Sequence, residues 1–199
     1  MGIFTGQTNN KYPAFANTRT FLIAVIVTDD ILIRHKKNHE QKNKMKVECT
    51  DKKTFQLIDN GRLLGQLTYK NLFSYSAEIT LKNSDCYEIK SVGFFGTSIN
   101  VTKNETEIAN LQMNWKGQIV VTFQDGQEFV FKTKGGFHNR YVIENKAEEK
   151  LIQFDPKFDW GKFNYNYDIS YDKKPEDILL VLLGIYASNY YIAAMSGQV

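Results

Sequence analysis

The sequence predicts a mainly β (α+β) fold, a closed antiparallel barrel of about twelve strands around a buried apolar C-terminal helix. From Met45 to Tyr171, short apolar alternations separated by turn residues recur every eight to twelve positions, the spacing of an antiparallel sheet protein. From Ile178 to Val199, 22 consecutive residues carry no charged side chain. A barrel of near twelve strands leaves room for a helix about 10 Å across.

The strands are expected in the segment that precedes Pro175, where no comparable helical periodicity occurs. Asp-Gly, Asn-Gly and Asn/Lys clusters separate them. The runs begin near Lys46, Thr54, Leu63, Ser76, Cys86, Ser98, Thr106, Gln118, Gln127, His138, Glu149 and Lys162.

Loop lengths in two hairpins follow from the faces on which the apolar residues fall. A three-residue loop at 124–126, with Gly126 in the left-handed position, places Ile119, Val121 and Phe123 on the side of Phe129 and Phe131. The same reasoning predicts a loop at 59–61. That loop puts one set of apolar side chains on a single face: Phe55, Leu57, Leu63 and Leu67.

The longest alternation predicts one apolar face and one solvated face in the strand before the helix. The expected core side chains are Phe163, Tyr165, Tyr167, Ile169 and Tyr171.

The helix is predicted over 175–195, with Pro175 in its first turn and Glu176 and Asp177 at its positive end. It is apolar on all sides and is therefore buried either in lipid or in protein. Polar side-chain groups near the middle of the helix favour burial inside the protein, because membrane helices keep tyrosines at the two interfaces. The alternative is a C-terminal membrane anchor flanked by Lys173 and Lys174. The polar groups belong to Tyr186, Asn189, Tyr190 and Tyr191.

The chain is predicted to consist of a basic N-terminal extension (1–45) and a barrel domain (46–199). The extension holds 7 Lys/Arg and 3 Asp/Glu, and the remainder holds 18 Lys/Arg and 19 Asp/Glu. The extension is expected to be disordered or to precede a natural start at Met45. The nearly neutral barrel excludes a nucleic-acid partner, which requires a basic field on the folded body.

Neither cofactor, metal nor disulfide is expected. Cys49 and Cys86 form no metal-binding spacing and are interpreted as buried small hydrophobic residues without a disulfide partner. His35 and His39 have helical metal-ligand spacing, but the basic stretch around them favours solvated side chains. Poor secretory features favour a cytoplasmic protein.

The element order from about Lys46 onward resembles the tubby C-terminal-like superfamily, which includes the LURP-one-related proteins and the phospholipid scramblases. The resemblance rests on "YEIKSVGFFGTSINV", "EIANLQMNWKGQIVVTF", "FHNRYVIEN" and "DILLVLLGIYASNYYIAAM". It implies a tubby-like barrel over 46–199 whose final helix fills the barrel, and a protein that acts at membranes or binds lipid headgroups.

The predicted function is a non-enzymatic binding module for an anionic lipid headgroup or a protein partner, cytoplasmic or peripheral at the membrane. Lys132, Lys134 and Arg140 are the candidate headgroup ligands, because strand phasing points them outward on adjacent strands. The alternatives are a structural or interaction protein and the anchored β protein. An enzyme is not expected, since catalytic motifs are lacking and only a convergence of Asp155, Asp159 and Asp168 would supply paired carboxylates.

Overall fold

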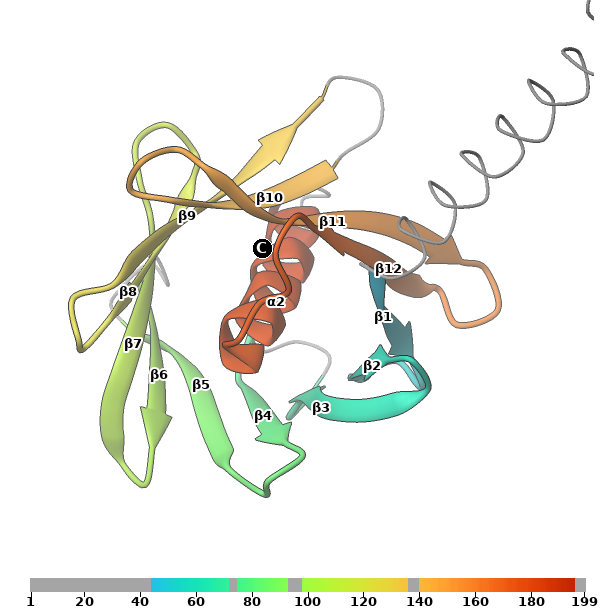
Figure 1. Cartoon of the computed structure of the whole chain (residues 1–199). Helices are drawn as coiled ribbons and strands as arrows, with labels where there is room; N and C mark the ends of the chain where they lie inside the picture. The colour runs from blue at the N-terminus through green and yellow to red at the C-terminus, as the bar shows by residue number, and fades with distance from the viewer. Residues whose placement is uncertain (1–43, 72–74, 93–97, 136–139, 196–199) are drawn as a thin grey trace, which may run out of the picture. The chain divides into compact units, whose positions relative to one another are not determined.

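A computed structural model describes residues 44–71, 75–92, 98–135 and 140–195, in which twelve antiparallel strands close into a barrel around one helix, α2 (Ile178–Met195) (Figure 1). Each strand pairs with its neighbours in sequence, and β1 pairs with β12, so every strand has a partner on both sides. The predicted fold class is confirmed. The strands are β1 (Lys44–Cys49), β2 (Thr54–Asp59), β3 (Arg62–Tyr69), β4 (Ala77–Leu81), β5 (Cys86–Val92), β6 (Ser98–Lys103), β7 (Thr106–Met113), β8 (Ile119–Phe123), β9 (Glu128–Lys134), β10 (Arg140–Asn145), β11 (Lys150–Asp159) and β12 (Asn164–Tyr171).

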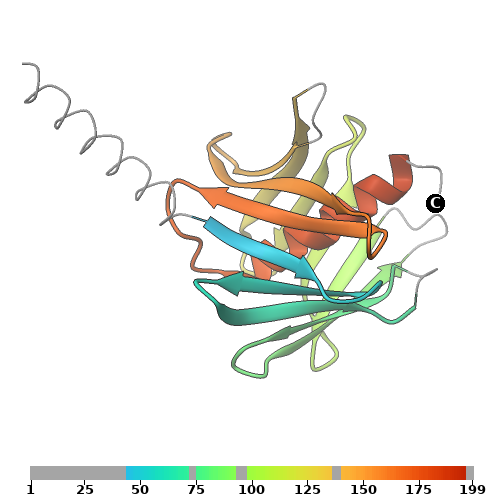
Figure 2. The same ribbon diagram turned by 90° about the vertical axis from the view of Figure 1, so that its right-hand side faces the viewer.

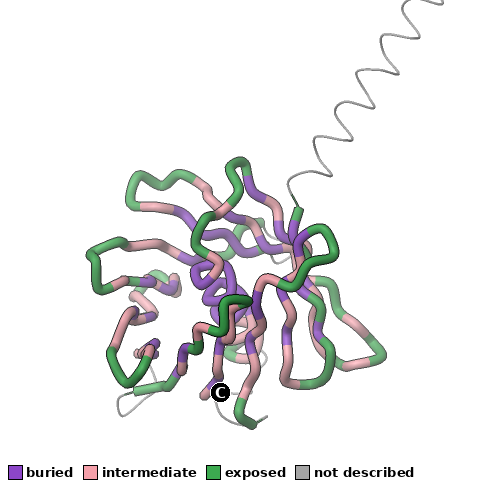
Figure 3. Tube along the Cα trace, turned by 60° about the horizontal axis from the view of Figure 1, so that its bottom comes forward, coloured by how far each residue is buried: buried purple, intermediate pink, exposed green. Residues whose placement is uncertain are grey.

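The two-residue period of the strands sorts their side chains between the inside of the barrel and its outer wall. In β1, Met45, Val47 and Cys49 are buried while the residues between them are exposed. Figure 3 shows the consequence along the chain, with buried residues on the helix and strands and exposed residues at the turns.

The core of the barrel is α2 itself. Every residue from Leu179 to Ser188 is buried, which explains why this helix is apolar on all sides. Gly184 permits the closest approach, because a Cβ there would lie 2.3 Å from Cζ of Phe154. The helix could be buried in lipid or in protein, and the structure shows it buried inside the barrel. In the part of the chain that is described, no helix is long and apolar enough to cross a bilayer.

The start of the helix differs from the prediction. Helix α2 begins at Ile178, so Pro175 and Glu176 lie before it. Asp177 is the N-cap: its Oδ1 accepts hydrogen bonds from the backbone N–H groups of Leu179 at 2.8 Å and Leu180 at 3.2 Å. Lys174 bonds to the buried carboxylate of Asp59, which fixes the connection between β12 and α2.

The β8–β9 hairpin has the predicted register. Ile119 lies opposite Phe131, Val121 lies opposite Phe129, and Gly126 has a φ of +83°. The backbone N–H of Phe123 bonds to the carbonyl of Gln127 at 2.8 Å and closes the three-residue loop.

The predicted β2–β3 loop is wrong. Asp59 pairs with Arg62, which leaves a two-residue turn at Asn60 and Gly61, both with positive φ. A β-bulge at Leu57 and Ile58 then shifts the pairing by one residue, so that Phe55 lies opposite Leu67 and both are buried. The prediction missed this bulge and therefore placed Leu63 in the core, although its side chain is 44% exposed.

Two further predictions need correction or lie outside the described residues. Cys49 is buried as expected, but Cys86 is exposed at the start of β5, and both are free cysteines. Only Lys44 and Met45 of the predicted extension are described, and they belong to β1. The interpretation of His35 and His39 falls outside the described residues.

Candidate functional site

The predicted cation cluster forms only in part. Arg140 lies opposite Lys134 across the β9–β10 pair, and Lys132 lies on the same wall. However, Lys132 bonds to the nearly buried carboxylate of Glu144 at 2.6 Å, and Nε of Arg140 lies 3.1 Å from Asp155. Two of the three charges are thus neutralised within the wall, and Lys134 alone of the three has no ion pair among the described residues.

Each of the three aspartates has a cationic partner on the wall of the barrel. Asp155 and Asp168 lie directly opposite each other on β11 and β12, but each has a cationic partner. Asp168 accepts a 2.6 Å bond from Lys157, and Asp159 lies 3.8 Å from Lys162. These carboxylates serve as ion-pair partners on the wall.

The topology sorts the turns between the two ends of the barrel. Because consecutive strands are antiparallel, the described turns that lead from an odd-numbered to an even-numbered strand lie at one end. Figure 2 shows the barrel from the side, with α2 running from one end to the other. We call the first end the tryptophan rim, since its fully described turns, 50–53, 114–118 and 160–163, include both tryptophans of the chain.

Four aromatic side chains cluster around the β11–β12 turn of the tryptophan rim. The ring of Phe158 lies 4.9 Å from Trp160, 6.1 Å from Phe163 and 5.1 Å from Tyr165, all edge to face. Trp160 is 77% exposed and Phe163 is 76% exposed. The prediction that Phe163 faces the core is wrong.

The local backbone explains why these rings point outward. The side chain of Asp159 accepts a 2.9 Å bond from the N–H of Gly161, which forms a tight turn beneath Trp160. Phe163 then adopts a φ of +51°, a conformation that a bulky residue rarely takes. This turn breaks the two-residue alternation between Phe163 and Tyr165, which is why the periodicity of the sequence misassigned Phe163.

Lysines lie beside the aromatic cluster. The ammonium of Lys162 bonds to the carbonyl of Cys49, and the amide of Asn164 donates a 3.2 Å bond to the carbonyl of Lys52. These bonds tie the β1–β2 turn, which contains Lys52 and Lys53, to the β11–β12 turn. Neither Lys52 nor Lys53 has an ion pair among the described residues.

The second tryptophan lies in the β7–β8 turn. Trp115 is 90% exposed, and the ammonium of Lys116 lies 5.3 Å from the centre of its ring. The side chain of Asn114 accepts bonds from the N–H groups of Lys116 at 2.9 Å and Gln118 at 3.0 Å, and so holds the turn open to solvent. The sequence signal was available: each tryptophan lies within two residues of a turn glycine and next to or near a lysine.

The opposite end, the charged rim, has a different character. Its described turns are 60–61, 82–85, 104–105, 124–127, 146–149 and 172–177, and none contains an aromatic residue. Ion pairs lie along it, including Lys103 with Asp85 at 2.8 Å and Lys146 with Glu128 at 3.9 Å. The two ends of the barrel therefore present different chemistry to their surroundings.

The fold and this site define a closed twelve-stranded antiparallel barrel that is filled by its own helix and carries exposed aromatic side chains and lysines at one rim. Comparison with models of known protein families, with curated proteins and with solved structures finds no significant match for this chain. Within the described ranges, no group of His, Cys, Asp and Glu residues could hold a metal ion.

Proposed function

We propose that this chain is a non-enzymatic binding module that docks its tryptophan rim on an anionic membrane surface. The observation that carries the proposal is the exposure of Trp115, Trp160 and Phe163 at one end of the barrel, beside lysines without ion pairs. Aromatic side chains favour the interface between lipid and water. A lysine close to an anionic leaflet adds about 1 kcal/mol.

A membrane suits this arrangement better than a protein partner does. Protein interfaces concentrate their strongest contacts at the centre of one patch. Here Trp115 and Trp160 lie on separate turns of the rim, and strands β9 and β10 lie between these two turns in the strand order. Side chains distributed around a rim suit contact with an extended surface. The predicted alternative, a protein partner on this rim, is an outcome of the experiment below.

The resemblance to the tubby C-terminal-like superfamily and a location at the cytoplasmic face of a membrane are parts of the same proposal. The order of twelve strands and a final helix that fills the barrel supports the resemblance. A headgroup site at Lys132, Lys134 and Arg140 receives less support, because Glu144 and Asp155 already pair with two of these cations.

Co-sedimentation with phospholipid vesicles tests the proposal. Wild-type protein should bind vesicles of phosphatidylcholine and phosphatidylserine and should bind pure phosphatidylcholine much less. Trp160→Ala combined with Phe163→Ala should weaken binding by about tenfold or more, since each large apolar side chain contributes roughly 1.5–3 kcal/mol when fully buried. Equal binding by this variant and the wild type would contradict the proposal.

A charge-matched pair of variants separates local from general electrostatics. Lys52→Gln with Lys53→Gln removes two charges from the tryptophan rim, whereas Lys146→Gln with Lys150→Gln removes two charges near the charged rim. Only the first pair should weaken vesicle binding. Unaffected vesicle binding in every variant, together with loss of a co-purified protein only in Trp160→Ala with Phe163→Ala, would assign the rim to a protein partner.

A further inference from the structure

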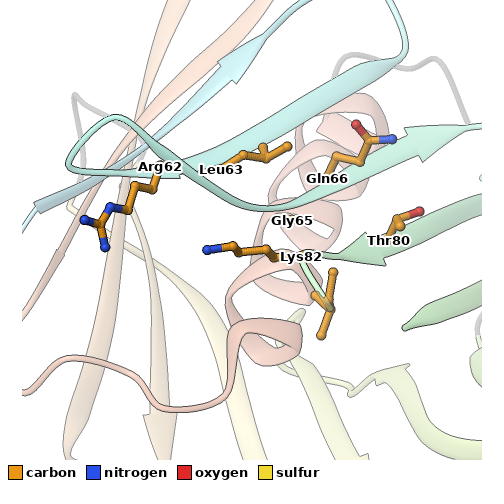
Figure 4. A pocket seen from close by; sticks show the side chains of 7 residues that line it. Arg62, Leu63, Gly65, Gln66, Thr80 and Lys82 are labelled. Atoms are coloured by element: carbon orange, nitrogen blue, oxygen red, sulfur yellow. The ribbon is translucent and has the colours of Figure 1, made fainter. Parts of the chain in front are cut away.

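A pocket of about 480 Å³ opens between β3 and β4, near the charged rim (Figure 4). Its size lies within the range of sites that hold small organic molecules. Figure 4 shows Arg62 and Lys82 at one end of the pocket and Gln66 and Thr80 at the other. Leu63, Gly65 and Leu81 complete the lining.

Arg62 and Lys82 are exposed and form no ion pair with any described residue. The nearest carboxylates in the sequence are already engaged, because Asp59 pairs with Lys174 at 2.5 Å and Asp85 pairs with Lys103 at 2.8 Å. The two cations therefore remain available to an external anion. An arginine at such a position can hold a phosphate or a carboxylate by two parallel hydrogen bonds.

The register of the sheet creates the apolar part of the pocket. The β-bulge at Leu57 and Ile58 shifts Leu63 out of the inward row, so its side chain is 44% exposed. Gly65 keeps β3 close to its neighbours, since a Cβ there would lie 3.0 Å from the carbonyl oxygen of Thr80 and 3.1 Å from Cδ2 of Leu81. An apolar surface thus lies next to the cationic end.

The two ends of the pocket differ in charge. The hydroxyl of Thr80 lies 3.5 Å from the carboxylate of Glu78, so negative charge already occupies the vicinity of that end. An anionic group is therefore favoured at Arg62 and Lys82. The side-chain amide of Gln66 can hydrogen-bond to a neutral polar group at the other end.

We infer that this pocket binds a small organic anion, with a phosphate or carboxylate group at Arg62 and Lys82 and an apolar portion on Leu63 and Leu81. The ligand is either a free small molecule that carries such an anionic group or the headgroup region of an anionic lipid. The inference is independent of the proposed function, because the pocket lies near the opposite rim of the barrel.

Titration of the full chain with phenyl phosphate, followed by NMR, tests the inference. The amide signals of Gln66 and Thr80 should shift and saturate as phenyl phosphate is added. Phenol, which lacks the anionic group, should bind with an affinity at least about tenfold lower. Arg62→Gln with Lys82→Gln should weaken phenyl phosphate binding by a similar factor. Lys134→Gln with Lys146→Gln, which removes the same charge elsewhere, should leave it unchanged.

Vesicles that contain phosphatidic acid distinguish the two sources of the anion. Weaker vesicle binding by Arg62→Gln with Lys82→Gln assigns the pocket to a lipid. Unchanged vesicle binding together with weakened phenyl phosphate binding assigns it to a free small anion. The inference is overturned if Gln66 and Thr80 show no saturable shift, or if both double variants lose the same affinity. Neither of the two results that overturn the inference changes the vesicle binding expected through Trp160 and Phe163, so the two proposals can fail separately.

Discussion

The hydroxyl group of Tyr167 on β12 donates a 2.6 Å hydrogen bond to the side-chain oxygen of Asn189 on α2. The amide of the same asparagine donates a 3.2 Å bond to the hydroxyl of Tyr69 on β3. One side chain of the helix is thereby tied to two strands of the barrel. These directional bonds fix the register of an apolar helix whose packing contacts alone are not directional.

Replacement of Asn189 should therefore destabilise the barrel. Asn189→Leu leaves two buried hydroxyl groups without this partner and should lower the free energy of unfolding by about 1–3 kcal/mol. Urea unfolding measures the loss. Tyr167→Phe in the N189L background should cost little further stability, because the orphaned hydroxyl is gone. Full additivity of the two single losses would contradict the proposed network.

Gly184 is the second point at which the helix and the wall are mutually constrained. A Cβ at this position would lie 2.3 Å from Cζ of Phe154 and 2.9 Å from Cδ1 of Ile143. Gly184→Ala should thus destabilise the protein by about 1–3 kcal/mol through overpacking, despite the better helix propensity of alanine. Phe154→Leu should recover part of this loss in the double variant. An increase in the free energy of unfolding for Gly184→Ala alone would contradict this prediction, because it would show that Phe154 and Ile143 move aside at little cost.

Alkaline pH should weaken the fold through its buried tyrosines. Burial raises the pKa of Tyr141 to about 12, and burial also raises the pKa values of Tyr69, Tyr167 and Tyr186. The folded state keeps these protons above about pH 10, where the unfolded chain begins to release them. Stability is therefore full below about pH 10 and falls as the pH rises toward the folded-state pKa values, by up to about 1.4 kcal/mol per pH unit for each such tyrosine.

Urea unfolding at about pH 9 and about pH 11.5 measures this dependence. Tyr141→Phe removes one of the four groups and should make the fall shallower. An unfolding midpoint that is equal at the two pH values would contradict the burial of these hydroxyls.

The two cysteines should differ in reactivity. Cys49 is buried, its thiol donates to the carbonyl of Asp51 at 2.6 Å, and burial raises its pKa to about 11. Cys86 is exposed. A maleimide should therefore label Cys86 in the native protein and Cys49 only after unfolding. Labelling of native Cys86→Ser at the wild-type rate would contradict this assignment.

The sequence predicted the architecture because the barrel follows a strict two-residue period over most of its length. Val121 and Phe129, for example, could be paired from their apolar faces alone. The prediction failed where the backbone leaves that period: the bulge beside Leu57 exposes Leu63, and the left-handed residue Phe163 exposes a ring assigned to the core. Such local irregularities depend on contacts with neighbouring strands, which the sequence pattern does not contain.

The candidate site was less predictable than the fold for a related reason. Strand phasing correctly placed Lys132, Lys134 and Arg140 on one wall, but the pairing of Lys132 with Glu144 and of Arg140 with Asp155 depends on the alignment of three strands. The tryptophan rim likewise emerges only when distant turns are assigned to the same end of the barrel. Trp115 and Trp160 are 45 positions apart in the sequence, and the topology places both on one rim.

Tryptophan fluorescence tests the docking of this rim most directly, because Trp115 and Trp160 are the two tryptophans of the chain. Trp115→Phe leaves Trp160 as the single reporter, and Trp160→Phe leaves Trp115. On vesicles of phosphatidylserine and bromine-labelled phosphatidylcholine, both reporters should shift their emission to the blue and be quenched by the bromine atoms. Sedimentation of the protein with vesicles while both tryptophans keep their solvent-exposed emission and escape quenching would contradict docking through the tryptophan rim.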